Sequence, residues 1–246
     1  MLLNIMPRFY IPNLSEKSVF RLSENTVRHI NSLRLKNGEV VTLFDGVGNE
    51  YPTRLNIESK NAYWAEVLEK NAVSRESPVQ IVLIQAVSTG EKMDFTVQKA
   101  VELGVAEIYP VLSEFSSVRL SGERAEKRRR RWQEIAIAAC EQCGRNTVPQ
   151  IHPVQSLYNV FNNLPNADTY LLLSPQGSLK MAEIKNKPQK IVLLIGAEGG
   201  FSETENQQAQ NAGFLPITLG KRILRTETAT LATLATVQTL WGDFVG

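Results

Sequence analysis

The chain has 246 residues, of which 43% are hydrophobic and 21% charged, and its formal net charge is +2. A charge this small excludes a histone-like polycation, although local basic patches can still bind nucleic acid. No apolar run approaches the roughly 20 residues that cross a bilayer, and residues 1–6 lack the pattern of a signal peptide, so we expect a cytoplasmic protein without membrane contact.

The N-terminal part of the chain predicts a small β-barrel. Its apolar residues alternate with polar ones in three short segments, as in half-buried strands. These segments are residues 40–44, 50–57 and 62–69. Asp45-Gly46 and Gly48-Asn49 separate the first two segments and favour a hairpin. The polar stretch 71–78 ends in Pro and indicates a linker, so we place the domains at 1–72 and 73–246.

The residue pattern changes after the linker. Residues 79–86 are typical of a buried strand, residues 94–103 of a helix that ends before Gly104, and residues 107–112 of another strand. Alternation of strand, helix and strand predicts a parallel sheet with crossover helices. The second domain is therefore expected to be α/β, within a chain that is α+β overall.

A long helix is predicted from Ser121 to Gly144, and its first half carries a run of cations. Its second half is small and apolar, which suits packing at one end and an anionic partner at the other. The alternative is an ordinary solvated face balanced by three glutamates of the same helix. The N-terminal domain adds cations and aromatic rings that together suit RNA. The candidate RNA-binding residues are Arg8, Tyr10, Arg28, Arg34, Lys36, Arg128 and Arg129.

Cys140 and Cys143 form a lone Cys-x-x-Cys inside this predicted helix. No second cysteine pair or nearby histidine completes a zinc site, so we expect reduced structural cysteines and no metal, with redox chemistry or metal binding as alternatives. His29 and His152 are the only histidines of the sequence, and neither accompanies a recognisable Ser or Cys nucleophile.

Three predicted strands end in polar, glycine-containing loops. They end near Leu173, Ile195 and Leu219. Carboxyl ends of neighbouring parallel strands meet at one edge of a sheet, where ligands of open α/β sheets bind. Cations follow the last strand, and residues 228–240 then form an apolar helix that needs a large surface to cover it.

The second of these loops, Gly196 to Gly200, is the most informative segment of the sequence about ligand binding. Its glycines let the backbone turn and approach a ligand closely, and Ser202 with Glu205 predicts a capping box that starts a helix. A tight turn without a ligand is the plain alternative, because short glycine motifs are weakly specific.

Several motifs together resemble the RsmE family over almost the whole chain. They are Arg8-Phe9-Tyr10, Leu33-Arg34-Leu35, Gly38-Glu39, the segment from Gly196 to Gly200, and the segment from Leu219 to Ala229. Members of this family methylate N3 of a uridine in the decoding region of 16S ribosomal RNA with S-adenosylmethionine. Ala197 and Lys221 stand where proline is common in the family, and neither change removes a chemical group.

The resemblance implies a PUA-like β-barrel followed by a SPOUT methyltransferase domain with a trefoil knot. It also implies a homodimer, a substrate within the small ribosomal subunit, and a methyl-donor pocket. The residues expected to bind the donor are Leu173, Leu194, Gly196, Glu198, Gly199, Gly200, Leu219, Gly220, Ile223, Leu224 and Thr226.

The chemistry of a uridine N3 indicates candidate catalytic residues. The nitrogen is a poor nucleophile until its proton leaves, and nearby cations stabilise the charge that then develops. Arg225 is the first candidate, whereas Glu198 or Glu227 could accept the proton or merely brace a loop.

Two other functions are alternatives to methyl transfer. An RNA-binding protein without methyl transfer is the main alternative. An ordinary nucleotide enzyme lacks support, because neither a Walker motif nor Gly-x-Gly-x-x-Gly follows an early strand.

Overall fold

The computed structural model describes residues 6–60 and 62–244. It divides into two compact units, and the chain enters the first of them twice. One unit holds the described residues up to Glu76 together with Cys140–Val148. The other holds Ser77–Ala139 and the described residues from Pro149 onward. None of the helices in this described part combines the length and apolar character that crossing a membrane requires.

The first unit is built on a six-stranded sheet of order β1-β3-β4-β5-β2, with β6 beside β4. Its elements are β1 (Arg8–Tyr10), β2 (Val19–Arg21), α1 (Glu24–Ser32), β3 (Val40–Phe44), β4 (Asn49–Ser59), β5 (Ala62–Val67) and β6 (Asn71–Ala72). Only the β1–β3 pair among these strands is parallel. The predicted hairpin is confirmed between β3 and β4, where the Asp45 carboxylate accepts hydrogen bonds from the amides of Val47 and Asn49.

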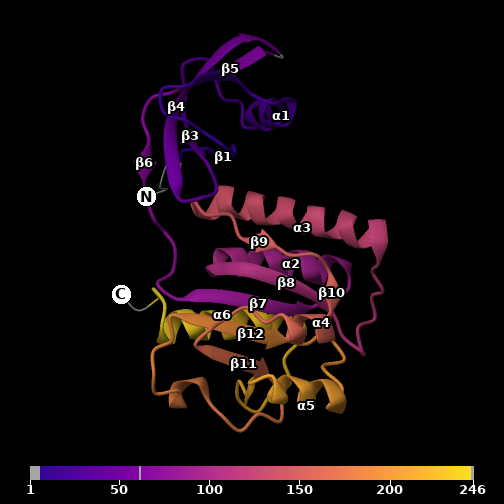
Figure 1. Cartoon of the computed structure of the whole chain (residues 1–246). Coiled ribbons are helices and arrows are strands. Elements are labelled where there is room, and N and C mark those ends of the chain that lie inside the picture. The colour runs from indigo at the N-terminus through magenta and orange to yellow at the C-terminus, as the bar shows by residue number, and fades with distance from the viewer. Residues whose placement is uncertain (1–5, 61, 245–246) are drawn as a thin grey trace. The chain divides into compact units, whose positions relative to one another are not determined.

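The second unit is a seven-stranded sheet of order β10-β8-β7-β12-β11-β13, with β9 beside β8 (Figure 1). Its strands are β7 (Gln80–Ala86), β8 (Val105–Leu112), β9 (Gln150–Ile151), β10 (Gln155–Ser156), β11 (Thr169–Leu173), β12 (Lys190–Ile195) and β13 (Leu215–Ile217). All of their pairings are parallel, which confirms the predicted sheet.

Helices and a short 3-10 turn connect these strands. They are α2 (Gly90–Glu102), α3 (Gly122–Cys143), α4 (Leu157–Asn162), η1 (Met181–Glu183), α5 (Glu203–Asn211) and α6 (Thr226–Leu240). The capping box predicted for α5 is confirmed, because the Ser202 hydroxyl accepts from the Glu205 amide and the Glu205 carboxylate accepts from the Ser202 amide. The trefoil knot implied by the family resemblance stays a prediction.

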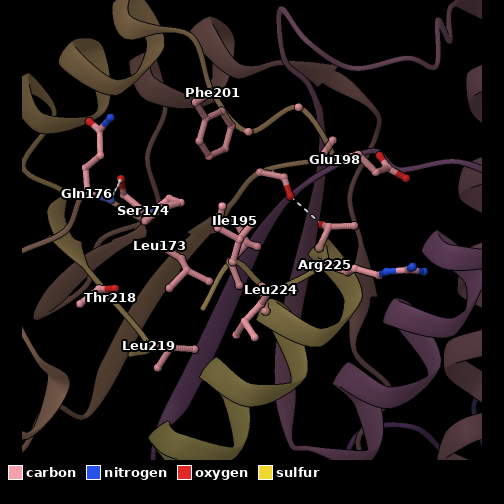
Figure 2. A pocket seen from close by; sticks show the side chains of 18 of the residues that line it. Leu173, Ser174, Gln176, Ile195, Glu198, Phe201, Thr218, Leu219, Leu224 and Arg225 are labelled. Carbon is pink, nitrogen blue, oxygen red and sulfur yellow. Dashed lines mark hydrogen bonds between the residues drawn. The ribbon is translucent and has the colours of Figure 1, made fainter. Parts of the chain in front are cut away.

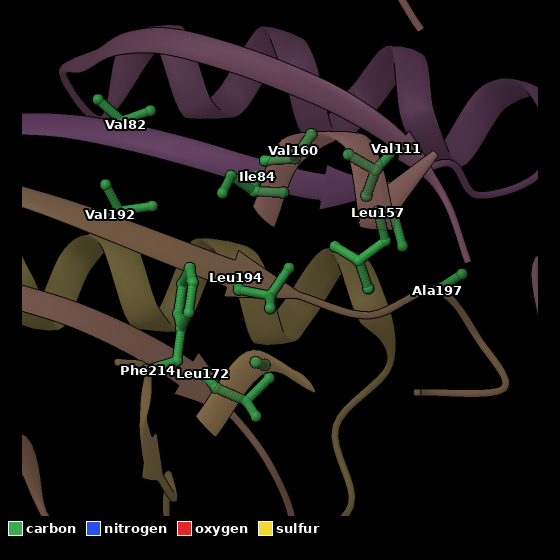
Figure 3. Packing of buried hydrophobic residues seen from close by; sticks show 12 residues of the cluster. Val82, Ile84, Val111, Leu157, Val160, Leu172, Val192, Leu194, Ala197 and Phe214 are labelled. Atoms are coloured by element: carbon green, nitrogen blue, oxygen red, sulfur yellow. The ribbon is translucent and has the colours of Figure 1, made fainter. Parts of the chain in front are cut away.

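The two faces of the parallel sheet have different partners, since successive side chains of a strand point to opposite faces. Ile84 and Leu194 lie in a buried cluster with Leu157 of α4 and Ala209 of α5 (Figure 3). Gln85, next to Ile84 on β7, instead accepts a hydrogen bond from Thr230 of α6. The residues next to Ile84 on β7 and next to Leu194 on β12 therefore point to the opposite face of the sheet, which α6 covers.

Helix α6 begins two residues earlier than the sequence predicts. Thr226 and Glu227 were expected in the preceding loop, but they form the first turn of the helix, and Arg225 is its N-cap residue. The early start was hard to predict, because Arg is not among the residues whose side chains usually cap helices.

Candidate functional site

A cavity of about 650 Å³ lies at the carboxyl edge of the parallel sheet, where the three predicted strand-end loops come together. Leu173 ends β11 and is followed by Ser174 to Gln176, and Ile195 ends β12 and is followed by Gly196 to Phe201. Much of the remaining wall comes from Thr218, Leu219, Arg222 to Thr226, and Ala229. The volume is in the range of ordinary ligand pockets. In Figure 2 the side chains of Leu173, Ile195, Leu219 and Leu224 gather around this space.

Most residues expected to bind the methyl donor line this cavity. They are Leu173, Gly196, Glu198, Gly199, Gly200, Leu219, Ile223, Leu224 and Thr226. Two do not. Leu194 is fully buried in the core cluster, because the pleat of β12 turns it away and presents Ile195 to the cavity instead. Gly220 lines a separate hollow on the α6 surface.

Two glycines of the second loop lie very close to their neighbours. A Cβ at Gly199 would lie 2.7 Å from the Cβ of Phe115, and one at Gly196 would lie 3.0 Å from the Cα of Gly200. The loop is therefore closely packed, with backbone rather than side chains forming part of the cavity wall.

A buried hydrogen-bond network joins two walls of the cavity. The Thr226 hydroxyl donates to the Gly196 carbonyl over 2.6 Å, and the Gln85 amide donates to Thr226 Oγ1 over 3.3 Å. Gln85 Oε1 accepts from the Thr230 hydroxyl at 2.7 Å. Gln85 is 1% exposed, so these bonds form away from water and fix the start of α6 against the end of β12.

Charged side chains lie at the rim of the cavity. Arg225 is exposed, and its side chain makes no capping bond to α6. In Figure 2 its guanidinium and the Glu198 carboxylate project to the same side, away from the apolar side chains. Glu198 accepts from the Lys92 ammonium at 2.8 Å and from the Thr89 hydroxyl at 3.3 Å. Burial raises the pKa of Glu198, but the hydrogen bond and charge of Lys92, together with backbone hydrogen bonds at Glu198 and Thr89, outweigh it, and the net pKa is lowered.

Some lining residues were missed by the sequence analysis. Lys92 belongs to the first turn of α2, which follows β7 after the short segment from Val87 to Thr89. The parallel pairing of β7 with β12 places the end of β7 at the same edge of the sheet, and this pairing could have indicated Lys92 as a lining residue. Ser174 directly follows one predicted strand and Phe201 directly follows the Gly196–Gly200 loop, so the same argument could have included both. Glu227, a candidate proton acceptor, is not among the lining residues.

The candidate RNA-binding residues fall into two groups. Arg28, Arg34, Lys36 and Arg128 are exposed. Arg8 instead is buried, and its guanidinium binds Glu50 at 3.0 Å and the side chain of Asn146. Its charge is satisfied inside the first unit, which corrects the expectation that it faces RNA. Tyr10 is half-buried against Phe44, and Arg129 pairs with Glu126 one turn earlier on α3.

Neither cysteine forms a disulfide, and Cys140 is buried. Burial raises the pKa of the Cys140 thiol to about 12, so it is a poor nucleophile near neutral pH. Within residues 6–60 and 62–244, no group of three or more His, Cys, Asp or Glu side chains is placed to hold a metal ion.

Comparison with known families defines the class of the protein. Residues 75–238 match the model of an RNA methyltransferase domain, and residues 22–68 match that of an RNA methyltransferase PUA domain. A ribosomal RNA small subunit methyltransferase E from Buchnera aphidicola is 34% identical over 97% of this chain and 95% of its own length. The chain therefore belongs to the RsmE family of RNA methyltransferases.

Further relatives have the same length and architecture. The Bacillus subtilis methyltransferase E is 31% identical over 94% of this chain and 96% of its own. The crystal structure of the Neisseria gonorrhoeae enzyme, bound to S-adenosylmethionine, is 49% identical and superimposes with a TM-score of 0.92. That match covers 98% of this chain and 100% of the neighbour. A Legionella pneumophila protein that also holds this cofactor is 36% identical, with the same TM-score, over 97% and 99% of the two chains.

Proposed function

We propose that this protein methylates N3 of a uridine in the decoding region of 16S ribosomal RNA, within the small ribosomal subunit. Membership of the RsmE family supports ribosomal RNA as the substrate. The exposed cation of Arg225 at the rim of a largely apolar cavity is the observation that carries the proposal, since a uridine N3 reacts only after its proton has left. Such a substrate places the protein in the cytoplasm.

The cavity fits S-adenosylmethionine as the methyl donor. Leu173, Leu219 and Leu224 would cover its adenosine and exclude water, and the backbone of Gly196 and Gly199 would form part of the wall around it. When bound, the cofactor supplies a methyl group that is activated by a sulfonium cation. Two structural neighbours hold this cofactor, at 49% and 36% identity.

Arg225 is proposed to stabilise the uracil as N3 loses its proton. The charge left on the ring is shared with the two flanking carbonyl oxygens, and a guanidinium can donate to such oxygens. The position of Arg225 supports this role. An exposed cation at a helix N-cap opposes the helix dipole and offers no capping acceptor, so the helix itself gains nothing from it. Residues that break a local rule in this way concentrate at functional sites.

The exposed basic residues of the first unit and of α3 are proposed to bind the RNA backbone. Arg28 lies on α1, and Arg34 and Lys36 follow it in the chain. These residues lie in or next to the region that matches a PUA domain of RNA methyltransferases. Arg128 is the corresponding candidate in the second unit, where it is exposed on α3. Each phosphate contact would make binding weaker as the salt concentration rises.

We further propose that the protein is a homodimer that buries the outer face of α6. Thr228, Ala232, Thr236 and Leu240 lie one turn apart along this face and line a hollow of about 560 Å³. Ile223, in the loop before α6, is 88% exposed and would add apolar area to such an interface. Sedimentation equilibrium should give twice the monomer mass, and A232E should give the monomer mass by placing a charge in the interface.

The decisive experiment offers a labelled methyl donor and this protein to small ribosomal subunits from a strain that lacks it, and in parallel to naked 16S ribosomal RNA. Digestion and mass spectrometry then locate the label. Label at N3 of a decoding-region uridine supports the proposal, and its absence from N3 in both substrates contradicts it.

The alternative is a protein that binds RNA but no longer transfers methyl groups. Calorimetric titration tests this alternative, because a protein that does not bind S-adenosylmethionine cannot use it as a methyl donor. The intact glycine loop and the largely apolar cavity favour the enzyme.

A further inference from the structure

Lys92 lies at the same cavity as Arg225, although it comes from a different part of the chain. It belongs to the first turn of α2 and lines the cavity, and its side chain is 36% exposed. Five charged side chains line the cavity in total: Lys92, Glu198, Glu203, Arg222 and Arg225. Three of them are cations, and Lys92, which is neither fully buried nor fully solvated, is suited to stabilise a charge that develops nearby.

The Lys92 ammonium is held in place by the glycine-rich loop. Its Nζ lies 2.8 Å from Glu198 Oε1, and the same oxygen accepts from the Thr89 hydroxyl at 3.3 Å. Thr89 is the N-cap residue of α2, yet its side chain makes no capping bond and turns to Glu198 instead. These contacts fix Glu198, and through it Lys92, between α2 and the loop after β12.

The same contacts make Glu198 unsuited to take a proton from a uracil. A carboxylate that accepts hydrogen bonds from an ammonium and a hydroxyl is stabilised in its charged form, and its net pKa is lowered accordingly. A useful general base has a pKa near the working pH, whereas the pKa of the Glu198 carboxylate is shifted further below neutrality. Its contacts are those of a group that positions a neighbouring cation.

We propose that Lys92 is a catalytic residue that, together with Arg225, stabilises the anionic uracil, and that Glu198 positions Lys92 rather than acting as the base. This inference rests on the proposed function. In the step concerned, the N3–H bond breaks, the proton passes to solvent water, and the electron pair stays on the ring, spread over N3 and its two flanking oxygens. The two cations favour this ionised form.

The proposal is tested by the pH dependence of kcat/KM with the RNA substrate. K92M removes the cation while keeping an unbranched side chain, so the rise of kcat/KM with pH should move to higher pH, with a loss of about a hundredfold near neutrality. K92R should keep most of the activity. E198Q should shift the rise to lower pH, because it removes the negative charge beside Lys92 but keeps an oxygen that can accept its hydrogen bond.

K99M is a matched control, since Lys99 lies on the same helix and pairs with Glu102 at 2.7 Å. It should leave the pH profile unchanged. RNA containing 5-fluorouridine, whose N3 proton is more acidic than that of uridine, should restore much of the K92M activity. Calorimetry should show wild-type affinity of K92M for S-adenosylmethionine.

Three results would overturn the inference. The first is a K92M profile that coincides with the wild type, and the second is a K92M defect that follows from lost donor affinity. The third is an E198Q variant that is inactive at every pH, which would make Glu198 the base. A wild-type protein that places no label on N3 would instead contradict the proposed function, and the role of Lys92 with it.

Discussion

The hydroxyl of Thr226 donates a 2.6 Å hydrogen bond to the carbonyl of Gly196, across 30 residues of sequence. Gly196 begins the loop after β12 and Thr226 begins α6, and both line the candidate cofactor cavity. The side-chain amide of Gln85, on β7, donates a hydrogen bond to the oxygen of the same Thr226 hydroxyl. A single side chain thus connects two cavity walls to the central strand of the sheet.

Replacing Thr226 with valine should weaken cofactor binding about tenfold, because Val keeps the shape but leaves the buried Gly196 carbonyl and Gln85 amide without this partner. T226S keeps the hydroxyl and should bind like the wild type. The dissociation constant for S-adenosylmethionine should be measured by calorimetry well below the unfolding temperature. Equal affinity of T226V and T226S would show that the bond does not hold the cavity in shape.

Replacing Arg225 with serine should make the protein more stable and less active. Arg225 has φ −66° and ψ 155°, close to the values of −66° and 164° at Ser202, whose hydroxyl caps α5. A serine at position 225 can therefore cap α6, which is worth about 1 kcal/mol. The melting temperature should rise while methyl transfer is lost. If R225S retained full turnover, Arg225 would have no part in the mechanism.

An alanine at Gly199 should disturb the loop, because its Cβ would lie 2.7 Å from that of Phe115. Overpacking of this kind costs about 1–3 kcal/mol. We expect weaker S-adenosylmethionine binding in G199A, measured by calorimetry. Gly90, at the start of α2, has no neighbouring atom within 4 Å of the position that a Cβ would occupy, so G90A is the matched control and should bind normally.

The first unit should lose stability in acid through Glu50. Burial raises the pKa of Glu50, but hydrogen bonds from Arg75, Arg8 and Asn146 outweigh it and lower the pKa to about 2. Because the folded pKa lies below the ordinary value of 4.5, Glu50 stabilises the fold fully above about pH 5 and progressively less as the pH falls towards 2. E50Q should therefore be clearly less stable than the wild type at pH 7.

The stability of E50Q at low pH is the control for this prediction. The difference in unfolding free energy between E50Q and the wild type should shrink between pH 5 and pH 3, as followed by urea denaturation. E66Q is a useful comparison, since the Arg54–Glu66 pair is largely exposed and should contribute little at any pH. A difference for E50Q that stays constant with pH would argue against the assigned ion pairs.

The sequence predicted the elements that depend on local patterns. The Asp45 hairpin, the Ser202 cap and the parallel strands all follow from side-chain chemistry or periodicity within a few residues. The convergence of three strand ends was predicted from the same signals, because parallel strands must share an edge.

Other features depend on contacts between distant residues, which no local pattern encodes. Arg8 was expected to face RNA, but its partners are Glu50 and Asn146, which lie 42 and 138 residues away. Leu194 and Ile195 are equally apolar, so the sequence could not indicate which of them faces the cavity. Lys92 was missed because the contact that brings it to the cavity loop is with Glu198, which is 106 residues away.

The double entry of the chain into the first unit has a consequence for biosynthesis. Arg8 and Glu50 are made early, but Asn146, which binds both side chains, belongs to a segment made much later. During translation from the N-terminus, the β-sheet of this unit can form while its buried arginine still lacks one partner. We therefore expect the first unit to reach its final stability only after residue 148 has left the ribosome, when the whole of α3 has already been synthesised.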